Sequence, residues 1–380
     1  MKHWQELGQI LERVLRPGHA GQPAALAIVT HIRGSAYRRP GAKLLIEQDG
    51  AVLGGVSGGC LEEDVRQVGL GVLRRGLSRV LHYETGADDN KVWGLGLGCD
   101  GEVDVAVVPI KADAARGTWA HVRELLEGDA PFALTMTIED GVRGDVVVVG
   151  KSGRRAGRLD DPAADAEVDA AAGAALRARR SSLHPAGPRT VFTEVLVPPP
   201  NLLVCGAGDD TRPLATFATA VGFRVFVADH RAAYLTAERF PAARKLLPMR
   251  PEEPSGDLPV DRRTHAVVMT HSIEHDTEWV RRLVATDVPY VGILGPHART
   301  GRIVAALGQR ARGRVFGPVG LDLGADGPEQ VALSILAELL AVWSGREPGH
   351  LRERLSTPER LRCCSTSRDA EGEEMCCLKE

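Results

Sequence analysis

Residues 201–231 read NLLVCGAGDDTRPLATFATAVGFRVFVADHR, and this stretch decides the fold of the second half of the chain. Its first residues, 202–205, form an apolar run without polar alternation, which is typical of a strand buried on both faces. A turn that begins at Gly206 leads into a helix with one apolar face, and Gly222 ends that helix where a left-handed residue is favoured. Residues 223–228 form a second strand. This order of strand, turn, helix and strand predicts a Rossmann-like, doubly wound parallel sheet.

The turn and the end of the second strand suit a nucleotide. The pattern G-x-G-x-x-G begins at Gly206, although Thr211 occupies its third glycine position. Backbone amides at such a turn bind a diphosphate at the helix amino terminus, and Asp229, about twenty residues further on, can hold a ribose hydroxyl. A Rossmann-like domain with a different ligand is the alternative. The predicted ligand contacts in this half are Gly206, Gly208, Asp209, Asp229, His271 and Gly295.

The bulk composition limits the classes of protein that remain. The chain has 380 residues, 43% hydrophobic and 26% charged, which is ordinary for a folded protein of two or three domains. Its formal net charge of -3 argues against a broad nucleic-acid surface, which needs a basic patch. No apolar run reaches membrane-spanning length, and acidic residues interrupt the amphipathic first segment, so we expect neither a signal peptide nor a membrane partner. Seven cysteines, an odd number, fit reduced thiols and a cytoplasmic location.

We expect two domains and a tail. Residues 1–197 combine strands, helices and glycine turns, as a mixed α/β domain does, and a proline run at 198–200 then indicates a linker. The Rossmann-like domain extends from 198 to 345. The charged tail 346–380 carries four cysteines, which are interpreted either as thiolates for a soft metal or, as we prefer, as exposed thiols on a flexible segment. These cysteines are Cys363, Cys364, Cys376 and Cys377.

Two cysteines of the first domain follow glycine turns. Cys60 comes after Ser57-Gly58-Gly59 and opens a predicted helix, where free amides and the helix dipole would stabilise a thiolate. A small buried residue that packs the turn is the alternative for Cys60. Cys99 lies in the segment GLGCDG, where a tight hairpin residue is the alternative. Two such cysteines in one domain suggest a shared anionic ligand more strongly than either does alone.

The loop HIRGSAYRRPGAK, residues 31–43, is rich in cations. Its arginines could clamp a phosphate, because the guanidinium group matches the geometry of phosphate oxygens. A solvated loop face without a ligand is the alternative. The residue types alone do not choose between an anion site and an ordinary charged surface.

Residues 271–275, HSIEH, match the H-x-x-E-H pattern of a zinc peptidase. A zinc site of this kind requires both histidines on one face of a helix. Here His271 follows directly on the predicted strand HAVVMT, so its backbone is expected to be extended or turning. We therefore interpret His271 as a ligand-pocket residue at the carboxyl end of a strand, and we predict no metal site.

Several segments together resemble the XdhC/CoxI family. GSAYRRPGAKLLI, GGVSGGCLEEDV and GLGLGCDGEVDV are similar to its amino-terminal domain, and LLVCGAGDDTRPLA, VADHR, MTHSIEHD, YVGILGPHART and PVGLDLGADGPEQVALSILAE are similar to its Rossmann-like carboxyl domain. The resemblance covers about residues 10 to 345 and leaves out the tail. In the histidine motif only His271 and Asp276 match the family, which removes the zinc interpretation. Asp100 is a mild departure, because the family often has Gly or Asn there.

The resemblance implies an accessory protein for xanthine dehydrogenase or carbon monoxide dehydrogenase. Family members bind the molybdenum cofactor (molybdopterin) transiently, support its sulfuration and deliver it to a molybdenum hydroxylase. This role is that of a maturation chaperone more than of a catalyst with its own turnover. The expected partners are the target hydroxylase and a cysteine desulfurase, and a homodimer is left open. An NAD(P)-binding oxidoreductase that uses the carboxyl domain is the alternative, although no obvious hydride-transfer set accompanies its glycine turn.

The chemistry of this cofactor fits the first domain. Molybdopterin is an anion with a phosphate and a dithiolene-bound oxo metal, so amide-rich turns and arginines are suitable donors. Cys60 and Cys99 are the candidate thiolates at molybdenum, an assignment that rests on sulfur chemistry, whereas the resemblance supplies only the role. The predicted cofactor contacts in this domain are Gly34, Ser35, Arg38, Gly41, Lys43, Gly58 and Gly59.

Overall fold

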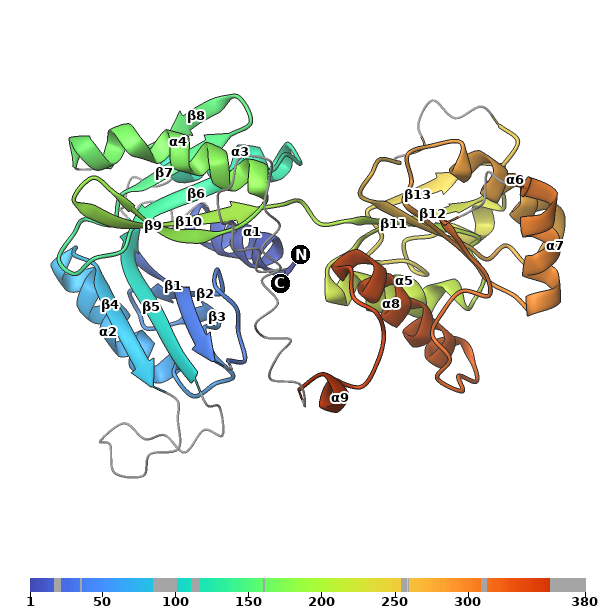
Figure 1. The fold of residues 1–380 in the computed structure, drawn as a ribbon, viewed down its shortest axis with the longest axis horizontal. Helices are drawn as coiled ribbons and strands as arrows, with labels where there is room; N and C mark the ends of the chain where they lie inside the picture. Colours follow the sequence, from blue (N-terminus) through green and yellow to red (C-terminus); the bar gives the residue numbers. More distant parts are fainter. Residues whose placement is uncertain are drawn as a thin grey trace, which may run out of the picture. The chain divides into compact units, whose positions relative to one another are not determined.

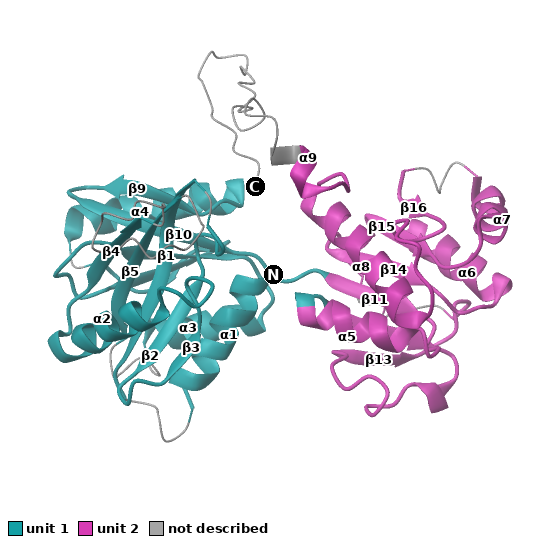
Figure 2. Ribbon diagram, turned by 90° about the horizontal axis from the view of Figure 1, so that it is seen from below, with its two compact units in different colours: residues 1–200, 221–223 teal, residues 201–220, 224–380 magenta. Residues whose placement is uncertain are grey.

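The computed structural model describes residues 1–16, 22–34, 36–84, 101–110, 117–159, 161–253, 258, 260–308 and 313–355. The chain divides into two compact units, which Figure 2 colours separately. Unit 1 is Met1–Pro200 with Val221–Phe223, and unit 2 is Asn201–Ala220 with Arg224–Glu380. The division falls at the end of the proline run, close to the boundary predicted between residues 197 and 198. Ser35, Cys99, Asp100 and the four tail cysteines lie outside the described residues.

The first sheet of unit 1 is antiparallel and has the strand order β3-β2-β1-β5-β4 (Figure 1). Its strands are β1 (Ala24–Gly34), β2 (Lys43–Glu47), β3 (Val52–Gly54), β4 (Arg79–Glu84) and β5 (Gly101–Ile110). One face packs against α2 (Glu62–Arg75), whose Val65 and Val72 share a buried core with Ala25, Ala27 and Val105. Small alanines on β1 leave room for the helix to approach the sheet.

The second sheet of unit 1 has the order β8-β7-β6-β10-β9 and is also antiparallel. Its strands are β6 (Phe132–Thr137), β7 (Val146–Gly150), β8 (Gly153–Ala156), β9 (Ser182–Ala186) and β10 (Arg189–Leu196). The alanine-rich segment that follows β8 forms α4 (Pro162–Ala178), and Asp161 caps its amino terminus. Ala164, Val168 and Ala172 are fully buried, so this helix also packs against the sheet.

A single apolar core joins the two sheets of unit 1. It contains Trp4 and Leu7 of α1 (Lys2–Val14) and Trp119 of α3 (Thr118–Glu127). Leu26 from the first sheet and Phe132 from the second belong to the same core. The amphipathic first segment is therefore a structural helix of unit 1, as its periodicity predicts.

Unit 2 is built on a parallel six-stranded sheet with the order β13-β12-β11-β14-β15-β16. The strands are β11 (Asn201–Cys205), β12 (Arg224–Asp229), β13 (Lys245–Pro248), β14 (Thr264–Val268), β15 (Tyr290–Ile293) and β16 (Val315–Phe316). Numbered within the unit this order is 3-2-1-4-5-6, which defines the doubly wound dinucleotide-binding sheet. The predicted fold class is confirmed for both halves of the chain.

Helices cover both faces of this sheet. They are α5 (Thr211–Val221), α6 (Ile273–Val284), α7 (His297–Leu307) and α8 (Pro328–Ser344), with the short η2 (Ala232–Tyr234) and α9 (Leu351–Leu355). Trp279 and Leu283 of α6 pack with Ala266 and Val291 of the sheet on one face. Figure 1 shows α5 and α8 on the opposite face. Because β11 is paired in parallel with β12 and β14, the glycine turn that follows β11 lies at the carboxyl edge of this sheet.

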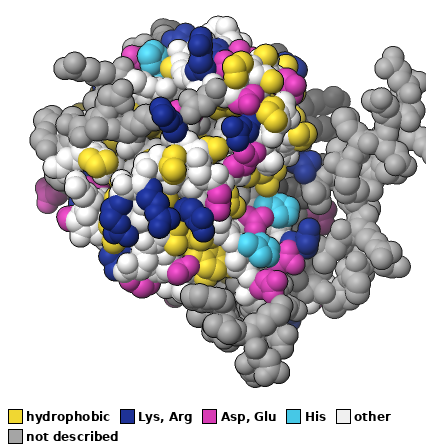
Figure 3. Space-filling view, turned by 90° about the vertical axis from the view of Figure 1, so that its left-hand side faces the viewer, with side chains coloured by type: hydrophobic (Ala, Val, Ile, Leu, Met, Phe, Trp, Pro, Cys, Tyr) yellow, Lys and Arg dark blue, Asp and Glu magenta, His cyan; other side chains and the backbone are white. Residues whose placement is uncertain are grey.

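Among the residues that the structure describes, no helix combines the length and the apolar character that a membrane crossing requires. Figure 3 shows Lys and Arg side chains interspersed with Asp and Glu on the face it presents. A mixed surface of this kind gives that face no broad single-sign field for a polyanion.

Candidate functional site

The glycine turn of unit 2 requires its first glycine. Gly206 has a φ of 121°, and a Cβ atom on it would lie 2.5 Å from the carbonyl oxygen of Met269. Thr211, which replaces the third glycine of the pattern, is fully buried and donates its hydroxyl to the Gly206 carbonyl oxygen at 2.8 Å. Thr211, in place of the third glycine, therefore closes the turn with a side-chain hydrogen bond.

Asp229 is held by its own chain. Its carboxylate accepts hydrogen bonds from the Ala207 amide at 2.7 Å and from the Arg231 amide at 2.8 Å. The Arg231 guanidinium adds bonds from Nε at 3.0 Å and Nη2 at 2.8 Å. Burial opposes the charge on Asp229, but the bonds from Arg231 and Ala207 outweigh it and lower the pKa to about 2. A carboxylate offers about four lone-pair positions, and all are used here. The predicted ribose role of Asp229 stays a prediction, and it requires displacement of a bond from Arg231.

Two arginines and a tyrosine flank the same turn. Arg239 donates through Nη2 to the Ala207 carbonyl at 3.1 Å and to the Asp209 carboxylate at 3.0 Å. The Tyr234 ring lies 4.2 Å from the guanidinium carbon of Arg231 and 5.1 Å from that of Arg239. Asp209, a predicted ligand contact, is thus exposed but already paired with a cation.

His271 and Asp210 form a hydrogen-bonded pair at this edge. The His271 backbone is left-handed, with a φ of 64°, which is uncommon for a residue other than glycine. Its Nε2 atom lies 2.8 Å from Oδ2 of Asp210, the residue just before α5. A Cβ atom on Gly208 would come within 2.6 Å of the other Asp210 oxygen, so a larger residue there would shift this carboxylate. The sequence predicted His271 and Gly208 as ligand contacts but missed Asp210.

A buried carboxylate fixes the residue that precedes His271. Oδ1 of Asp276 accepts the amide of Thr270 at 3.0 Å and its hydroxyl at 2.6 Å. Oδ2 of the fully buried Asp276 is paired with Arg299 at 2.5 Å. Gly295, with a φ of 138°, lies against the Arg299 side chain and so belongs to the same edge. The Asp that the family motif shares with this chain therefore holds the backbone beside His271.

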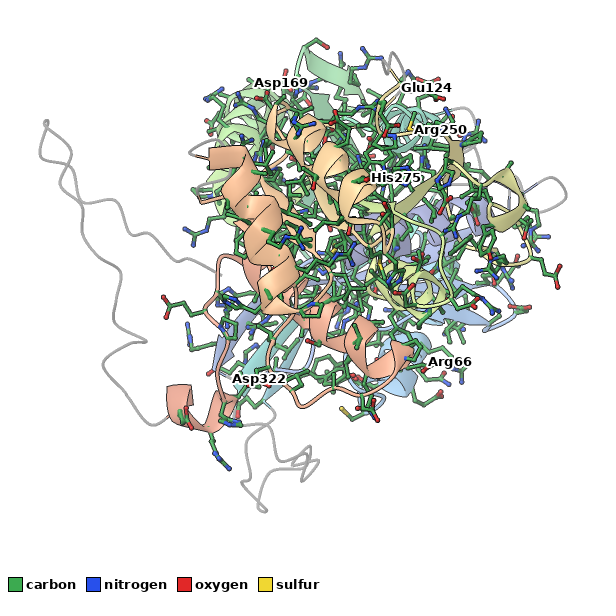
Figure 4. The ribbon with its side chains drawn as sticks, turned by 90° about the vertical axis from the view of Figure 1, so that its right-hand side faces the viewer. Arg66, Glu124, Asp169, Arg250, His275 and Asp322 are labelled. Atoms are coloured by element: carbon green, nitrogen blue, oxygen red, sulfur yellow. The ribbon has the colours of Figure 1, made fainter. Side chains whose placement is uncertain are left out.

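The H-x-x-E-H pattern does not form the geometry of a zinc peptidase. His271 precedes α6, whereas His275 lies inside that helix and is labelled in Figure 4. The His275 ring packs edge-on against His230, with 4.9 Å between the ring centroids. Within the described ranges, no group of three or more His, Cys, Asp or Glu residues is arranged to hold a metal ion.

In unit 1 the glycine turn before α2 is organised by a serine. The Ser57 hydroxyl accepts the amides of Gly59, Cys60 and Leu61, each at 3.1 Å. Glu62 accepts the Ser57 amide at 2.8 Å and the Ser57 hydroxyl, which fixes the turn to the first residue of the helix. Ser57 therefore takes up amides that the sequence suggested were free for a Cys60 thiolate. The Cys60 side chain itself is exposed, as a reactive rather than a packing residue would be.

Tyr37 lies over this turn, a contact that sequence reasoning missed. A Cβ atom on Gly58 would be 3.6 Å from the Tyr37 ring, so one face of the ring rests on the glycine. The residue is 77% exposed, the highest value among the large hydrophobic residues in the described part of unit 1 and unit 2. Gly59, with a φ of 114°, has open space where a side chain would project. The turn thus offers a thiol, an aromatic ring and an uncrowded backbone.

Arg38 and Lys43, which the sequence predicts as cofactor contacts, each form an ion pair with a buried glutamate. Arg38 pairs with the buried Glu6 at 2.5 Å, and Lys43 pairs with the buried Glu194 at 2.5 Å. Lys43 is 0% exposed and also donates to the Gly41 carbonyl at 2.8 Å. A contact between Lys43 and a cofactor stays a prediction, and it requires this buried pair to open.

Gly41 and Gly34 shape the loop that carries these cations. Gly41 has a φ of 95°, and a Cβ atom there would lie 2.7 Å from Nδ1 of His3 and 2.8 Å from Oε1 of Glu194. Gly34 ends β1 with a φ of 79°. Arg39, between the two engaged cations, is exposed. Arg39 is therefore the exposed cation of the described loop after Gly34.

The fold defines a two-unit α/β protein whose second unit is a Rossmann-type domain. Residues 202–339 match the XdhC Rossmann domain, and residues 18–84 match the XdhC and CoxI family. The chain belongs to the XdhC and CoxI family, as its motifs predict.

Relatives support this membership along most of the chain. The chain is 32% identical over 322 residues to a probable xanthine dehydrogenase subunit of Bacillus subtilis (strain 168), covering 84% of this chain and 93% of that protein. It is 29% identical over 177 residues to the uncharacterized protein YqeB of Escherichia coli (strain K12), covering 45% of this chain and 32% of YqeB. The crystal structure of a xanthine dehydrogenase from Bacillus halodurans superposes with a TM-score of 0.74 at 25% identity, covering 94% of this chain and 99% of the other.

Proposed function

We propose that this protein is an accessory factor for a xanthine dehydrogenase-type molybdenum hydroxylase. In this proposal it binds the molybdenum cofactor, supports the sulfuration of that cofactor and delivers it to the hydroxylase in the cytoplasm. The name of the Bacillus subtilis relative supports a connection with xanthine dehydrogenase. A cysteine desulfurase is the proposed sulfur source. The protein acts as a carrier, and the cofactor is its cargo.

The observation that carries the proposal is the turn around Cys60. The Cys60 side chain is exposed on a backbone fixed by the Ser57 hydroxyl, and the Tyr37 ring lies over the neighbouring Gly58. Molybdenum and its terminal sulfur are soft partners for a thiolate. A pterin ring is flat and can stack on an aromatic side chain. The donor set of this turn therefore fits the cofactor.

The phosphate of the cofactor requires a cation, and the structure favours a different one from those predicted. Arg38 and Lys43 are paired with Glu6 and Glu194 in a buried network. Arg39 is exposed on the same loop, and its guanidinium can form two parallel bonds to a phosphate. We assign the phosphate contact to Arg39, with Arg38 and Lys43 as anchors of the loop.

The alternative, an NAD(P)-dependent oxidoreductase, has less support from unit 2. The strand order suits a dinucleotide. However, Asp229, the expected ribose acceptor, already accepts four hydrogen bonds from Ala207 and Arg231. A dinucleotide would have to break charged bonds worth about 1.5–3 kcal/mol each before it gained its own.

Variants of Cys60 test the proposed function. The full chain is produced with its target hydroxylase, and the hydroxylase is analysed for molybdenum, for cyanide-releasable sulfur and for activity. We expect the Cys60→Ala variant to fold and to yield hydroxylase with molybdenum but with little terminal sulfur. Cys60→Ser, which keeps the size of the side chain but not the soft thiolate, should behave like the alanine variant. Wild-type sulfur content from both variants would remove the chemical role of Cys60, and a wild-type chain that binds no molybdopterin would refute the proposal itself.

A further inference from the structure

A cavity of about 340 Å³, which we call the Arg143 cavity, opens in unit 1 beside the carboxyl end of α2. Most of its wall is apolar, and Arg75 and Arg143 are the charged residues that line it. The apolar residues of the wall are Pro23, Leu73, Leu77, Pro109 and Ile110. Pockets that bind small molecules start at about 300 Å³ and combine an apolar lining with a few polar groups. The cavity therefore has the size and the lining of a small-molecule site.

The backbone around Arg143 is fixed on both sides. Before it, the amide of the buried Ser78 donates to the Val142 carbonyl at 2.8 Å, and the Val142 amide donates to the Ser78 hydroxyl at 3.2 Å. After it, Gly144 has a φ of 66°, and a Cβ atom there would lie 2.7 Å from Cδ of Pro109. The loop between β6 and β7 thus holds Arg143 at the cavity without the help of a ligand.

Neither guanidinium of the cavity is paired. Arg75 and Arg143 are exposed and have no hydrogen-bond or ion-pair partner among the residues that the structure describes. Arg75 lies in the last turn of α2, where the helix dipole favours a cation, so its position is explained without a ligand. Arg143 lies in a loop, where no helix end accounts for it. Two unpaired cations on an apolar wall give the cavity a positive potential that its lining leaves unbalanced.

A second cavity, of about 210 Å³, adjoins the first and shares Leu77 and Arg143 with it. Its lining includes the carboxylates Asp145 and Asp161 as well as the cation Arg189. Charges of both signs meet there, whereas the charged residues that line the Arg143 cavity are both cations. An anion is therefore attracted to the Arg143 cavity rather than to its neighbour.

We propose that the Arg143 cavity binds a small organic oxyanion, a molecule that carries one carboxylate or phosphate group on an apolar body. The oxyanion accepts hydrogen bonds from Arg143 and Arg75, because the guanidinium fork matches both of these groups. The apolar body lies against the apolar wall, and the surface that it buries there stabilises the complex. An inorganic anion would leave the apolar wall in water, and a neutral apolar molecule would leave both cations unpaired. The wall and the charges together select an amphipathic anion.

The Arg143 cavity is separate from the turn around Cys60. Cys60 lies before the amino end of α2, and Arg75 is the last residue of the same helix. The helix has 14 residues, so a rise of about 1.5 Å per residue puts its ends about 20 Å apart. The oxyanion site is thus an addition to the proposed cofactor site, and either can exist without the other.

Three matched probes test the ligand class on the full chain. Naphthoate carries a carboxylate on an apolar ring system, naphthamide has the same shape without the charge, and acetate has the charge without the rings. By isothermal titration calorimetry we expect saturable binding of naphthoate, binding of naphthamide about tenfold weaker, and no displacement by equimolar acetate. Naphthyl phosphate, titrated in the same way, determines which oxyanion is preferred. Equal affinity for naphthoate and naphthamide, or no binding of either naphthyl oxyanion, would overturn the proposal.

Variants of the arginines test the location of the site. Arg143→Gln should bind naphthoate about tenfold more weakly than the wild type and keep its melting temperature, because the side chain has no partner in the described structure. Arg74→Gln is the matched control, since Arg74 is exposed on α2 but does not line the cavity. In the methyl-labelled full chain, naphthoate should shift the resonances of Leu77 and Ile110. Cys60→Ala should bind naphthoate like the wild type, which keeps this test independent of the cofactor proposal. Unchanged affinity in Arg143→Gln, an equal loss in Arg74→Gln, or shifts confined to other residues would refute the assignment.

Discussion

Nζ of Lys43 lies 2.5 Å from Oε1 of Glu194, although the two residues are 151 positions apart in the chain. Lys43 begins β2 in the first sheet of unit 1, and Glu194 lies on β10 in the second. Both side chains are buried, so the pair is a charged link across the apolar core that joins the sheets. Burial raises the pKa of Glu194, against the lowering effect of the Lys43 charge.

Removal of one partner of this pair should destabilise unit 1. Lys43→Ala leaves a buried carboxylate without its cation, for which we expect a loss of about 3–5 kcal/mol in the free energy of unfolding. The double variant Lys43→Met/Glu194→Met removes both charges and should recover most of that loss. Urea unfolding monitored by circular dichroism measures both. A Lys43→Ala variant as stable as the wild type would show that the pair contributes nothing to folding.

His3 should make the stability of the protein depend on pH. Burial, followed by the charge of Lys43 and the amino terminus, lowers the pKa of His3 to about 3. The unfolded chain takes up this proton near pH 6.5, whereas the folded chain takes it up only near pH 3. The unfolded state thus binds more protons between these values, so this contribution to stability is complete above pH 6.5 and declines as the pH falls. His3→Asn should make the free energy of unfolding vary less between pH 7.5 and 4.5.

His82 provides a control of opposite sign for that experiment. Its hydrogen bond to Asp104, at 2.6 Å, raises the pKa of His82. Stability from this pair is present at low pH and is lost as the pH rises through the raised pKa. His82→Asn should therefore steepen the loss of stability on acidification, while His3→Asn reduces it. The same direction of change in both variants would contradict the assignment of His3.

The strands and the glycine turns were predictable because their signals are local. An uninterrupted apolar run at 202–205 identifies a strand buried on both faces without any tertiary information. The partner of Lys43 was not predictable, because Glu194 is distant in the sequence and nothing near either residue indicates the pair. Arg38 and Lys43 were therefore predicted as cofactor contacts, although both are paired with buried carboxylates.

Asp229 should contribute to stability independently of any ligand. Asp229→Asn loses charged hydrogen bonds to Arg231, for which we expect a cost of about 2–3 kcal/mol in the free energy of unfolding. Because the pKa of Asp229 is lowered to about 2, its contribution is complete above the unfolded value near 4 and is lost as the pH falls toward 2. The difference in melting temperature between wild type and variant should shrink over that range. A constant difference from pH 7 to pH 2 would rule out a role for the carboxylate charge.

It was predictable which residues of unit 2 lie near one another, but their hydrogen-bond partners were not predicted. Gly206, Gly208 and His271 do gather at one sheet edge, because the strand order that unites them follows from the sequence pattern. Asp229 and Arg231 are only two residues apart in the sequence ADHR, so their ion pair could have been predicted from this spacing. The exposure of Tyr37 was not predictable, because it depends on how the loop lies over Gly58.

Tyr37 supplies the last prediction, which concerns cofactor affinity rather than chemistry. If the exposed face of its ring stacks on the pterin, Tyr37→Leu should weaken molybdopterin binding by about 0.5–1.5 kcal/mol, or about two- to tenfold. Tyr37→Phe keeps the ring and should bind like the wild type. Arg38, which neighbours Tyr37, is anchored to the buried Glu6, so neither substitution should alter the melting temperature.

Binding of molybdopterin is measured by titration of the full chain, followed by the change in protein fluorescence. Equal affinity for Tyr37→Leu and Tyr37→Phe would exclude stacking. Normal affinity in Tyr37→Leu with poor transfer to the hydroxylase would instead assign the ring to the contact with the partner.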